Sequence, residues 1–324
     1  MKKLYLLIAF YLLVFNVQAQ FTIEKIHFES ANPYSFNDII TDLDKQEKQE
    51  VFGELVIPQD STDNEKKYPL IIGVAGSLGW GEHHYKYLEM YQEMGIATFE
   101  LNSFKSRSIT STVGTQNEIT MAAMILDAYR AFEVLAEHPK IDKDKVSITG
   151  WSLGGGVTLF SAWLPLKEAI NKELSFASHL AYYPPCFINP DNTDFSQSPI
   201  HILIGELDNW TPSAPCSDLV NKLSLKTNIS LTIYKDSYHS FDRDAPVIRN
   251  ENAYNFSDCI FRLDEKGNIL MNYLNIPMSN PFLQKIGFII STCVSRGVDF
   301  GGNPQAREKS FNFSKEFMKK TLLN

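Results

Sequence analysis

A short β-branched run breaks into a glycine-rich turn at residues 146–156, VSITGWSLGGG. The turn has the pattern Gly-x-Ser-x-Gly, with Ser152 at its centre. A buried strand that reverses sharply into a helix needs residues without Cβ around the turn, so that a strained serine can hold its hydroxyl clear of the backbone. The following helix directs its unpaired N–H groups and positive dipole end toward that serine. Glycine-rich turns also serve purely structural ends, but the flanking strand and helix favour a nucleophile.

Apolar strands alternate with helices along the rest of the chain, which predicts an α/β fold with a mostly parallel sheet covered on both faces. The predicted strands are 51–57, 69–75, 96–101, 146–149, 176–182, 200–204 and 229–234, and the predicted helices are 84–94, 118–137, 154–164 and 215–223. Residues 21–44 have a mixed pattern and are predicted to be a peripheral leader. In such sheets the functional site lies at the carboxyl ends of the strands.

The first 19 residues have the composition of a secretory signal peptide, with a basic start, an apolar core and a small-residue end. The apolar run is too short for a comfortable membrane span and no cysteine follows it, so we expect no membrane anchor. We therefore expect a periplasmic or secreted protein with residues 20–324 as a single domain. The formal net charge of −8 argues against nucleic-acid binding. The sequence does not indicate an oligomeric state.

Four cysteines in an exported chain favour two disulfides, although the sequence alone allows three pairings. We predict that Cys186 pairs with Cys216, because both follow strand ends at the same rim, and that Cys259 pairs with Cys293. The cysteines have neither CxxC nor histidine-rich spacing, so we expect no metal site.

A serine nucleophile needs a base to take its proton and a third group to orient that base. In this fold class the order along the chain is serine, acid, histidine. Asp208 and His239 follow Ser152 in that order, each just past a predicted strand. Taken singly, such an aspartate is often a turn or helix cap and such a histidine is often a packed side chain. Together with the turn, they predict a Ser152–His239–Asp208 triad.

Two backbone N–H groups are needed to hold the oxyanion, one from the residue after the nucleophile and one from the loop after the third strand. Leu153 supplies the first. For the second we predict Ser77, within Gly76-Ser77-Leu78-Gly79, with Leu78 as the alternative. The same four residues could also be no more than a tight turn.

Four motifs together resemble the dienelactone hydrolase family of α/β-hydrolases. They are Gly150-Trp-Ser-Leu-Gly-Gly155, Gly205-x-x-Asp-Asn-Trp-Thr-Pro212, Tyr238-His-Ser-Phe-Asp242 and Gly301-Gly-Asn-Pro-x-Ala306. Asn102-Ser-Phe-x-x-Arg107 resembles a feature of exported members, and the similarity runs from about Pro69 to the C-terminus. The resemblance implies the α/β-hydrolase fold and hydrolysis of an ester or lactone without a metal or other cofactor.

The chain departs from this family in two places. The enzyme that names the family uses a cysteine nucleophile, so Ser152 makes dienelactone itself an unexpected substrate. Ala75 stands where the family usually has a histidine before the glycine of the oxyanion loop, which should alter the packing of that loop more than its backbone donor.

Three further side chains are candidates for substrate binding. Arg107 either grips a substrate carboxylate or pairs with a structural acid such as Glu100 or Glu118. Trp151 and Trp210 flank the candidate nucleophile and acid, and either line a pocket or belong to the core.

Residues 242–302 form a long excursion between His239 and the predicted last helix. Their apolar content predicts an ordered segment, because structureless loops of this length are uncommon in compact domains. The segment either walls the pocket and sets substrate size or covers an edge of the sheet.

The expected function is a serine hydrolase that cleaves a small-molecule carboxylic ester or lactone through an acyl-enzyme. One alternative is a prolyl-oligopeptidase-like peptidase, but such enzymes normally carry a further domain. The other is an exported binding protein on the hydrolase scaffold. Serine, aspartate and histidine in the required order count against that second alternative.

Overall fold

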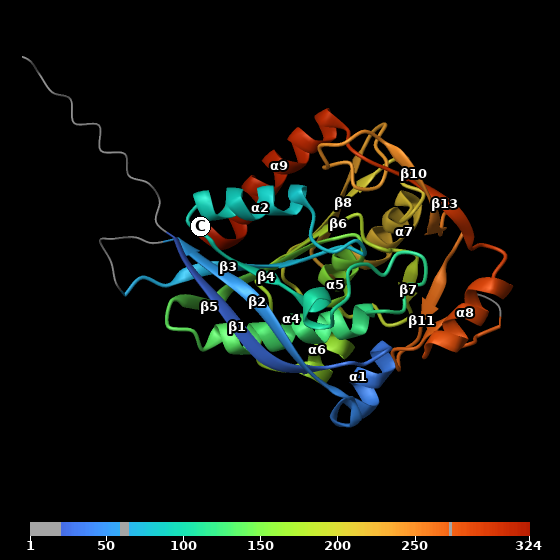
Figure 1. Cartoon of the computed structure of the whole chain (residues 1–324), viewed down its shortest axis with the longest axis horizontal. Helices are drawn as coiled ribbons and strands as arrows, with labels where there is room; N and C mark the ends of the chain where they lie inside the picture. Colours follow the sequence, from blue (N-terminus) through green and yellow to red (C-terminus); the bar gives the residue numbers. More distant parts are fainter. Residues whose placement is uncertain (1–20, 59–64, 272–273) are drawn as a thin grey trace, which may run out of the picture.

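The computed structural model describes residues 21–58, 65–271 and 274–324. The predicted signal peptide, residues 1–19, lies outside these described residues. An eight-stranded sheet forms the centre of the molecule, and its strands lie in the order β1-β2-β4-β3-β5-β6-β8-β9 (Figure 1). The bounds are β1 Phe21–Ala31, β2 Lys48–Pro58, β3 Tyr68–Val74, β4 Ala97–Leu101, β5 Ile141–Trp151, β6 His179–Tyr182, β8 Ile200–Gly205 and β9 Ile229–Tyr234.

The sheet is parallel from β4 to β9, and only β1 and β2 run antiparallel to their neighbours. The chain leaves β3 toward β4 on one side and later returns to β5 on the other side of β3. A crevice forms at the carboxyl ends of the strands where the direction of winding changes in this way. The predicted mostly parallel sheet is confirmed, and this crevice is where the site lies.

Helices cover both faces of the sheet (Figure 1). Their bounds are α1 Phe36–Asp42, α2 Glu82–Glu93, α3 Ser103–Ser106, α4 Met121–Ala136, α5 Leu153–Phe160, α6 Leu164–Ile170, α7 Ser213–Leu223, α8 Pro281–Ile290 and α9 Pro304–Met318. Helices α2 and α9 lie together on one side of the sheet, where Tyr87 and Ser310 share a hydrogen bond of 2.8 Å. Helix α4 lies on the other side with its apolar residues buried, as its spacing predicts.

Residues 21–31 are an edge strand, so the prediction of a peripheral leader is wrong. Strand β1 pairs with β2 along its whole length, from Phe21 opposite Pro58 to Ala31 opposite Lys48. The sequence pattern did not predict this strand, because apolar residues such as Ile23, which is 67% exposed, do not mark a buried face. Pairing with a neighbour far along the chain, rather than burial, determines its structure.

Residues 242–302 form an ordered excursion at one end of the sheet, as predicted, within the part that the structure describes (Figure 1). Strand β10, Ile248–Asn255, pairs with β13, Ser295–Phe300. Strand β11, Phe261–Leu263, pairs with β12, Ile269–Leu270, and with β7, Ile188–Pro190. Helix α8 completes this segment.

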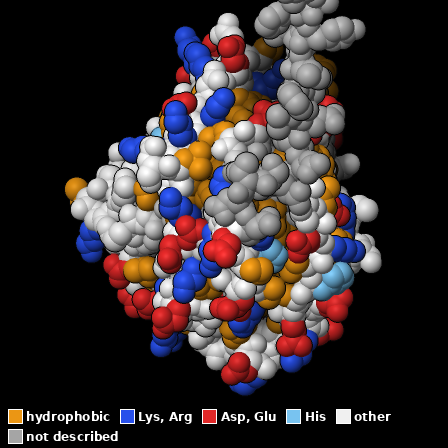
Figure 2. Space-filling model, turned by 90° about the vertical axis from the view of Figure 1, so that its left-hand side faces the viewer, with side chains coloured by type: hydrophobic (Ala, Val, Ile, Leu, Met, Phe, Trp, Pro, Cys, Tyr) orange, Lys and Arg blue, Asp and Glu red, His pale blue; other side chains and the backbone are white. Residues whose placement is uncertain are grey.

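Two disulfides join the cysteines in the predicted pairs, Cys186 with Cys216 and Cys259 with Cys293. The second bond lies wholly within the excursion. Disulfides persist in oxidising compartments, so both bonds are consistent with an extracellular environment. Among the described residues, no helix is long and apolar enough to cross a membrane. Acidic and basic side chains are interspersed over the face drawn in Figure 2.

Candidate active site

Ser152 occupies a strained turn between β5 and α5. Its backbone φ of 58° and ψ of −113° place it in a region that non-glycine residues rarely adopt. Neighbouring glycines make the turn possible: a Cβ on Gly150 would lie 2.2 Å from the Gly154 carbonyl oxygen, and one on Gly154 would lie 2.2 Å from the Val74 carbonyl oxygen. The sharp strand-to-helix reversal therefore requires glycine at both positions.

The structure brings the three predicted triad residues together. Nε2 of His239 lies 2.9 Å from Oγ of Ser152, and Nδ1 of His239 lies 2.7 Å from Oδ2 of Asp208. All three side chains are buried. They come from the ends of three strands: Ser152 follows β5, Asp208 follows β8 and His239 follows β9.

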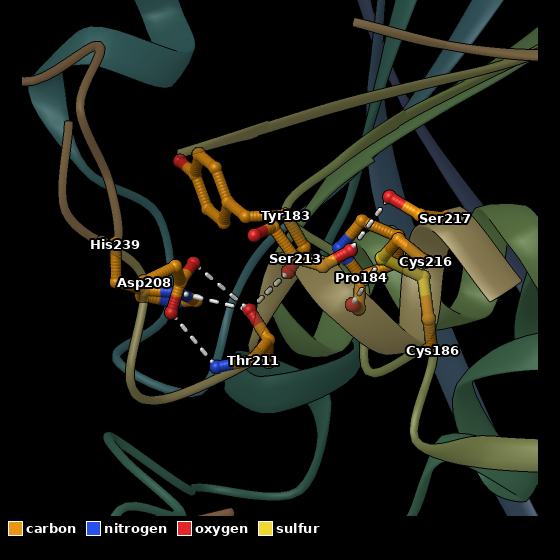
Figure 3. The surroundings of a disulfide bond; sticks show 9 residues. All are labelled: Tyr183, Pro184, Cys186, Asp208, Thr211, Ser213, Cys216, Ser217 and His239. Carbon is orange, nitrogen blue, oxygen red and sulfur yellow. Dashed lines mark hydrogen bonds and ion pairs between the residues drawn. A yellow bond between two sulfur atoms is a disulfide. The ribbon is translucent and has the colours of Figure 1, made fainter. Parts of the chain in front are cut away.

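Asp208 is fixed by its own loop and by Thr211. Its Oδ1 accepts hydrogen bonds from the backbone N–H groups of Trp210 and Thr211, at 2.9 and 2.8 Å. This leaves Oδ2 for His239. The hydroxyl of Thr211 lies 3.1 Å from Oδ2 of Asp208, 3.1 Å from Nδ1 of His239 and 3.0 Å from the carbonyl oxygen of Tyr183 (Figure 3). Thr211 thus joins the acid, the histidine and the residue that follows β6.

The loop predicted to complete the oxyanion hole lies against the serine turn. A Cβ on Gly76 would be 3.0 Å from the Trp151 carbonyl oxygen and 3.3 Å from Cβ of Ser152. Ser77 is buried and lines the space in front of Ser152, whereas the side chain of Leu78 is 46% exposed. Leu153, the first residue of α5, directly follows Ser152 and lines the same space.

Two pockets open beside Ser152, and both contain Ser77 and Trp210 in their walls. The first pocket, of about 150 Å³, is mostly apolar and is built from the start of α4, the segment before α1, and the excursion. The second, of about 140 Å³, lies between the loop before α2 and the loop after β9. We call them the aromatic pocket and the histidine pocket. Figure 1 shows α1 and the excursion side by side, at the end of the sheet where the aromatic pocket forms.

The two candidate tryptophans have different surroundings. Trp151 is fully buried, with its ring centroid 4.4 Å from that of His84 and 5.4 Å from that of Tyr182, so it belongs mainly to the core. Trp210 lies at the junction of the two pockets, with its ring centroid 4.9 Å from that of His239. Trp151 also lines the histidine pocket, whereas Trp210 lines both pockets.

Arg107 is not in the pocket beside Ser152, which corrects its inclusion among the candidate substrate-binding residues. Its guanidinium makes two hydrogen bonds of 2.7 and 3.0 Å to the buried carboxylate of Asp127 in α4. Asn32 and the backbone oxygen of Ser103 accept further hydrogen bonds from it. The structural role expected as the alternative is present, but its acid is Asp127 rather than Glu100 or Glu118.

The histidine pocket contains polar groups that the sequence did not single out. His83 and His84, at the start of α2, lie with their ring centroids 3.9 Å apart. Burial lowers the pKa of His83, and burial with the neighbouring His83 holds the pKa of His84 well below its usual value, so both rings are neutral near pH 7. Nε2 of His83 lies 4.0 Å from the buried carboxylate of Asp242, which accepts a hydrogen bond of 2.9 Å from Tyr183.

Thr211, Tyr183 and Asp242 are further residues that sequence reasoning did not assign to the site. Thr211 and Asp242 both stand inside motifs that carry the family resemblance, and this was the available signal for them. Nothing in the local sequence marks Tyr183, because its contacts come from residues in other loops.

Comparisons with known proteins agree with the fold. The model of the dienelactone hydrolase family matches residues 89–258, just over half of the chain. Among solved structures, a dienelactone hydrolase-like promiscuous phosphotriesterase from metagenomic libraries has a TM-score of 0.52 and 13% identity, covering 94% of this chain and 99% of that chain. The protein named m3DLH has a TM-score of 0.55 and 12% identity, covering 93% and 99%.

Peptidases are also among the similar structures. The acylaminoacyl peptidase of Pyrococcus horikoshii has a TM-score of 0.48 and 15% identity, covering 69% of this chain and 38% of the peptidase. At these identities the solved structures show the fold alone. No curated protein matches the chain.

Proposed function

The chain belongs to the dienelactone hydrolase family of the α/β-hydrolase superfamily, and on that premise we propose that it is a serine esterase acting on a small-molecule carboxylic ester or lactone. The observation that carries the proposal is the continuous hydrogen-bonded line from Ser152 through His239 to Asp208, at 2.9 and 2.7 Å. Nucleophile, base and orienting acid at these distances are what acyl transfer requires.

In the proposed first step, Nε2 of His239 takes the hydroxyl proton as Oγ of Ser152 attacks the ester carbonyl carbon. Asp208 accepts the Nδ1 hydrogen, which fixes the tautomer and stabilises the imidazolium that forms. The carbonyl oxygen becomes an oxyanion and is held by the backbone N–H groups of Leu153 and Ser77. The tetrahedral intermediate collapses as His239 returns the proton to the alcohol oxygen, which leaves an acyl group on Ser152.

The second step reverses these roles with water as the nucleophile. His239 takes a proton from water, the hydroxide attacks the acyl carbon, and the same N–H groups hold the second oxyanion. Collapse breaks the bond to Oγ of Ser152, and His239 returns the proton to that oxygen. Every group used comes from the chain itself.

Residues 242–302 serve in this proposal as a pocket wall within a single domain of residues 20–324. Phe256, Phe261, Ile269, Met278 and Phe288 line the aromatic pocket, and all belong to the excursion. Because these side chains line the pocket that contains Ser152, they support a role for the excursion as a pocket wall rather than as a simple cover for a sheet edge. The two disulfides support export, which the proposed signal peptide would direct.

Serine labelling and ester turnover test this function directly. A fluorophosphonate should label Ser152 in the intact protein and should fail to label Ser152→Ala. The same variant should lose p-nitrophenyl ester turnover by several orders of magnitude while its circular dichroism is unchanged, because it removes the nucleophile without adding volume. Ser224→Ala, at an exposed position, is the matched control and should behave as wild type.

A p-nitroanilide run beside the esters distinguishes an esterase from a peptidase. Turnover of esters without turnover of anilides is expected. Full labelling of Ser152→Ala, or turnover of no ester by a folded wild-type protein, would show that the proposed function is wrong.

A further inference from the structure

The two pockets beside Ser152 differ in the residues of the proposed chemistry that line them. His239 lines the histidine pocket, whereas the lining of the aromatic pocket does not include it. Leu153 and Thr211, on the contrary, line only the aromatic pocket. The pockets therefore lie on different sides of the bond that Ser152 would attack.

This difference fixes how an ester must lie. When the tetrahedral intermediate collapses, the departing alcohol oxygen takes a proton from Nε2 of His239. The alcohol must therefore extend into the pocket that His239 lines, and the acyl group must extend into the other one. We propose that the substrate is an ester of an apolar acid with a hydroxyl-bearing alcohol, with the acid in the aromatic pocket and the alcohol in the histidine pocket. This assignment rests on the proposed function.

The walls of the aromatic pocket suit an uncharged, apolar acyl group. Four phenylalanines pack around one another there: Phe187, Phe256, Phe261 and Phe288. The ring centroids of Phe187 and Phe256 are 4.6 Å apart, and those of Phe256 and Phe288 are 5.6 Å apart. The described residues that line this pocket include no charged side chain. An acyl group with a carboxylate would lose its water there without gaining a charged partner. Each additional methylene should instead raise kcat/KM about fourfold until the chain reaches the far wall.

The walls of the histidine pocket suit hydroxyl groups. Nδ1 of His84 accepts a hydrogen bond of 3.0 Å from the backbone N–H of Gly81, so in the neutral ring the proton is on Nε2. The ring of His83 forms part of the wall, with its Nε2 buried 4.0 Å from the carboxylate of Asp242 and without a hydrogen-bond partner among the described residues. Ser240 and Arg243 add further polar side chains to the lining. A hydroxyl can both donate and accept, which is what this mixture of groups can use.

Two matched ester series test the assignment on the wild-type protein. With p-nitrophenol as the fixed alcohol, kcat/KM should rise from acetate through butanoate to hexanoate, and the hemisuccinate should be at least tenfold poorer than butanoate. With butanoate as the fixed acid, the glyceryl ester should be at least tenfold better than the propyl ester, which has the same carbon skeleton. A hemisuccinate as good as butanoate, or a propyl ester as good as the glyceryl ester, would overturn the proposal.

Two variants assign each preference to its pocket. His83→Phe keeps the ring that packs on His84 but removes both nitrogens, so the glyceryl preference should fall at least fivefold with the acyl ranking unchanged. Met278→Ala enlarges the aromatic pocket, so the optimum acyl length should increase with the glyceryl preference unchanged. His27→Phe, on the exposed face of β1, is the control and should change neither. Crossed effects, in which each variant changes the other series, would mean that the orientation is reversed.

A measurement without any variant keeps the assignment testable if either variant does not fold. Alkyl phosphonates with a p-nitrophenyl leaving group react with the serine and leave the alkyl chain on the acyl side. Labelling of wild-type Ser152 should be faster with a hexyl than with a methyl phosphonate, and equal or inverted rates would overturn the orientation. Failure of every phosphonate to label Ser152 would instead refute the proposed function.

Discussion

The phenol hydroxyl of Tyr183 donates a hydrogen bond of 2.9 Å to the buried carboxylate of Asp242. Its ring meets the ring of His239 at a steep angle, with a centroid distance of 4.7 Å. Burial raises the pKa of Tyr183, and the nearby Asp242 charge raises it further, so the phenol keeps its proton and remains a donor. Tyr183 has a positive φ of 38°, which a non-glycine residue tolerates only where its surroundings hold it. The side chain of Tyr183 thus contacts both His239 and the buried carboxylate of Asp242.

Removing the Tyr183 hydroxyl should reduce stability more than catalysis. Tyr183→Phe leaves Asp242 without its hydrogen bond, since Oδ2 of that carboxylate has no partner among the described residues. The loss should be about 1–3 kcal/mol in urea unfolding, while kcat stays within tenfold because the ring against His239 remains. Tyr234→Phe, at another buried tyrosine, is the control. A thousandfold loss of kcat with unchanged stability would assign the hydroxyl to the chemistry instead.

Asp208→Asn should abolish catalysis through the tautomer of His239. The backbone N–H groups of Trp210 and Thr211 require an acceptor at Oδ1, so the asparagine must turn its NH₂ group toward Nδ1 of His239. The proton of the ring then moves to Nε2, which can no longer take the serine proton. We expect kcat to fall about 10⁴-fold with little change in KM. Asp258→Asn, at an exposed site, should have no effect, and comparable activity in both variants would contradict the triad.

Arg107 and Asp127 should matter for stability and not for substrate choice. Asp127→Asn leaves the guanidinium buried without its charged partner, which should cost about 3–5 kcal/mol in unfolding free energy. Relative kcat/KM values across the ester series should not change at a temperature where the variant is folded. A selective loss for carboxylate-bearing esters would return Arg107 to the substrate site.

The two disulfides should be separable by function. Each closes a loop, with sequence separations of 30 and 34 residues, and should contribute about 3 kcal/mol on the chain-entropy model. Replacing Cys259 and Cys293 together by alanine should also change the ranking of acyl lengths, because that bond ties together the excursion that lines the aromatic pocket. Replacing Cys186 and Cys216 should lower stability and change that ranking less, because only Pro185, Phe187 and Ile188 line the pocket beside Cys186. Thermal unfolding measures the loss of stability, and the ester series measures the acyl-length ranking. A ranking identical to wild type in the Cys259 and Cys293 double variant would count against a pocket-wall role for residues 242–302.

The buried histidines predict a loss of stability in mild acid. Burial lowers the pKa of His179 to about 4, whereas in the unfolded chain it should be near 6.5. The unfolded state therefore binds the proton first as the pH falls, and the stability present above pH 6.5 is lost progressively down to about pH 4. For this residue the loss should reach about 3 kcal/mol. His179→Asn should flatten the dependence in urea unfolding at pH 7, 5.5 and 4.5, and an unchanged slope would contradict this account.

Most of the scaffold could be predicted because its rules are local. Parallel strands buried on both faces are continuously apolar, as in 69–75, and the turn at Ser152 requires glycines at fixed positions. The close approach of Ser152, His239 and Asp208 could be predicted because the fold fixes both their order and the strand ends that carry them. Strand β1 could not be predicted in this way. Its residue Phe21 is 40% exposed, and the structure of the strand depends on pairing with β2, which follows α1 in the chain.

The supporting polar groups escaped prediction for a related reason. Tyr183 and Asp242 are 59 residues apart, and no spacing rule connects two loops at the rim of a sheet. Arg107 was a different case, because a signal was present: Asp127 is the one charged residue in the apolar stretch 121–129, where an acid needs a partner. A guanidinium 20 residues earlier was a better candidate for that partner than for a substrate.

The rim of the aromatic pocket is closed by a hydrogen bond of 2.8 Å from Tyr34 to Gln284, residues that are 250 positions apart. During synthesis, every group of the proposed triad has left the ribosome well before Gln284 does. The order of synthesis therefore places Ser152, Asp208 and His239 ahead of Gln284, which lines the aromatic pocket. On the proposed function, the residues that react are therefore synthesised before most of the residues in 242–302 that would select the acid.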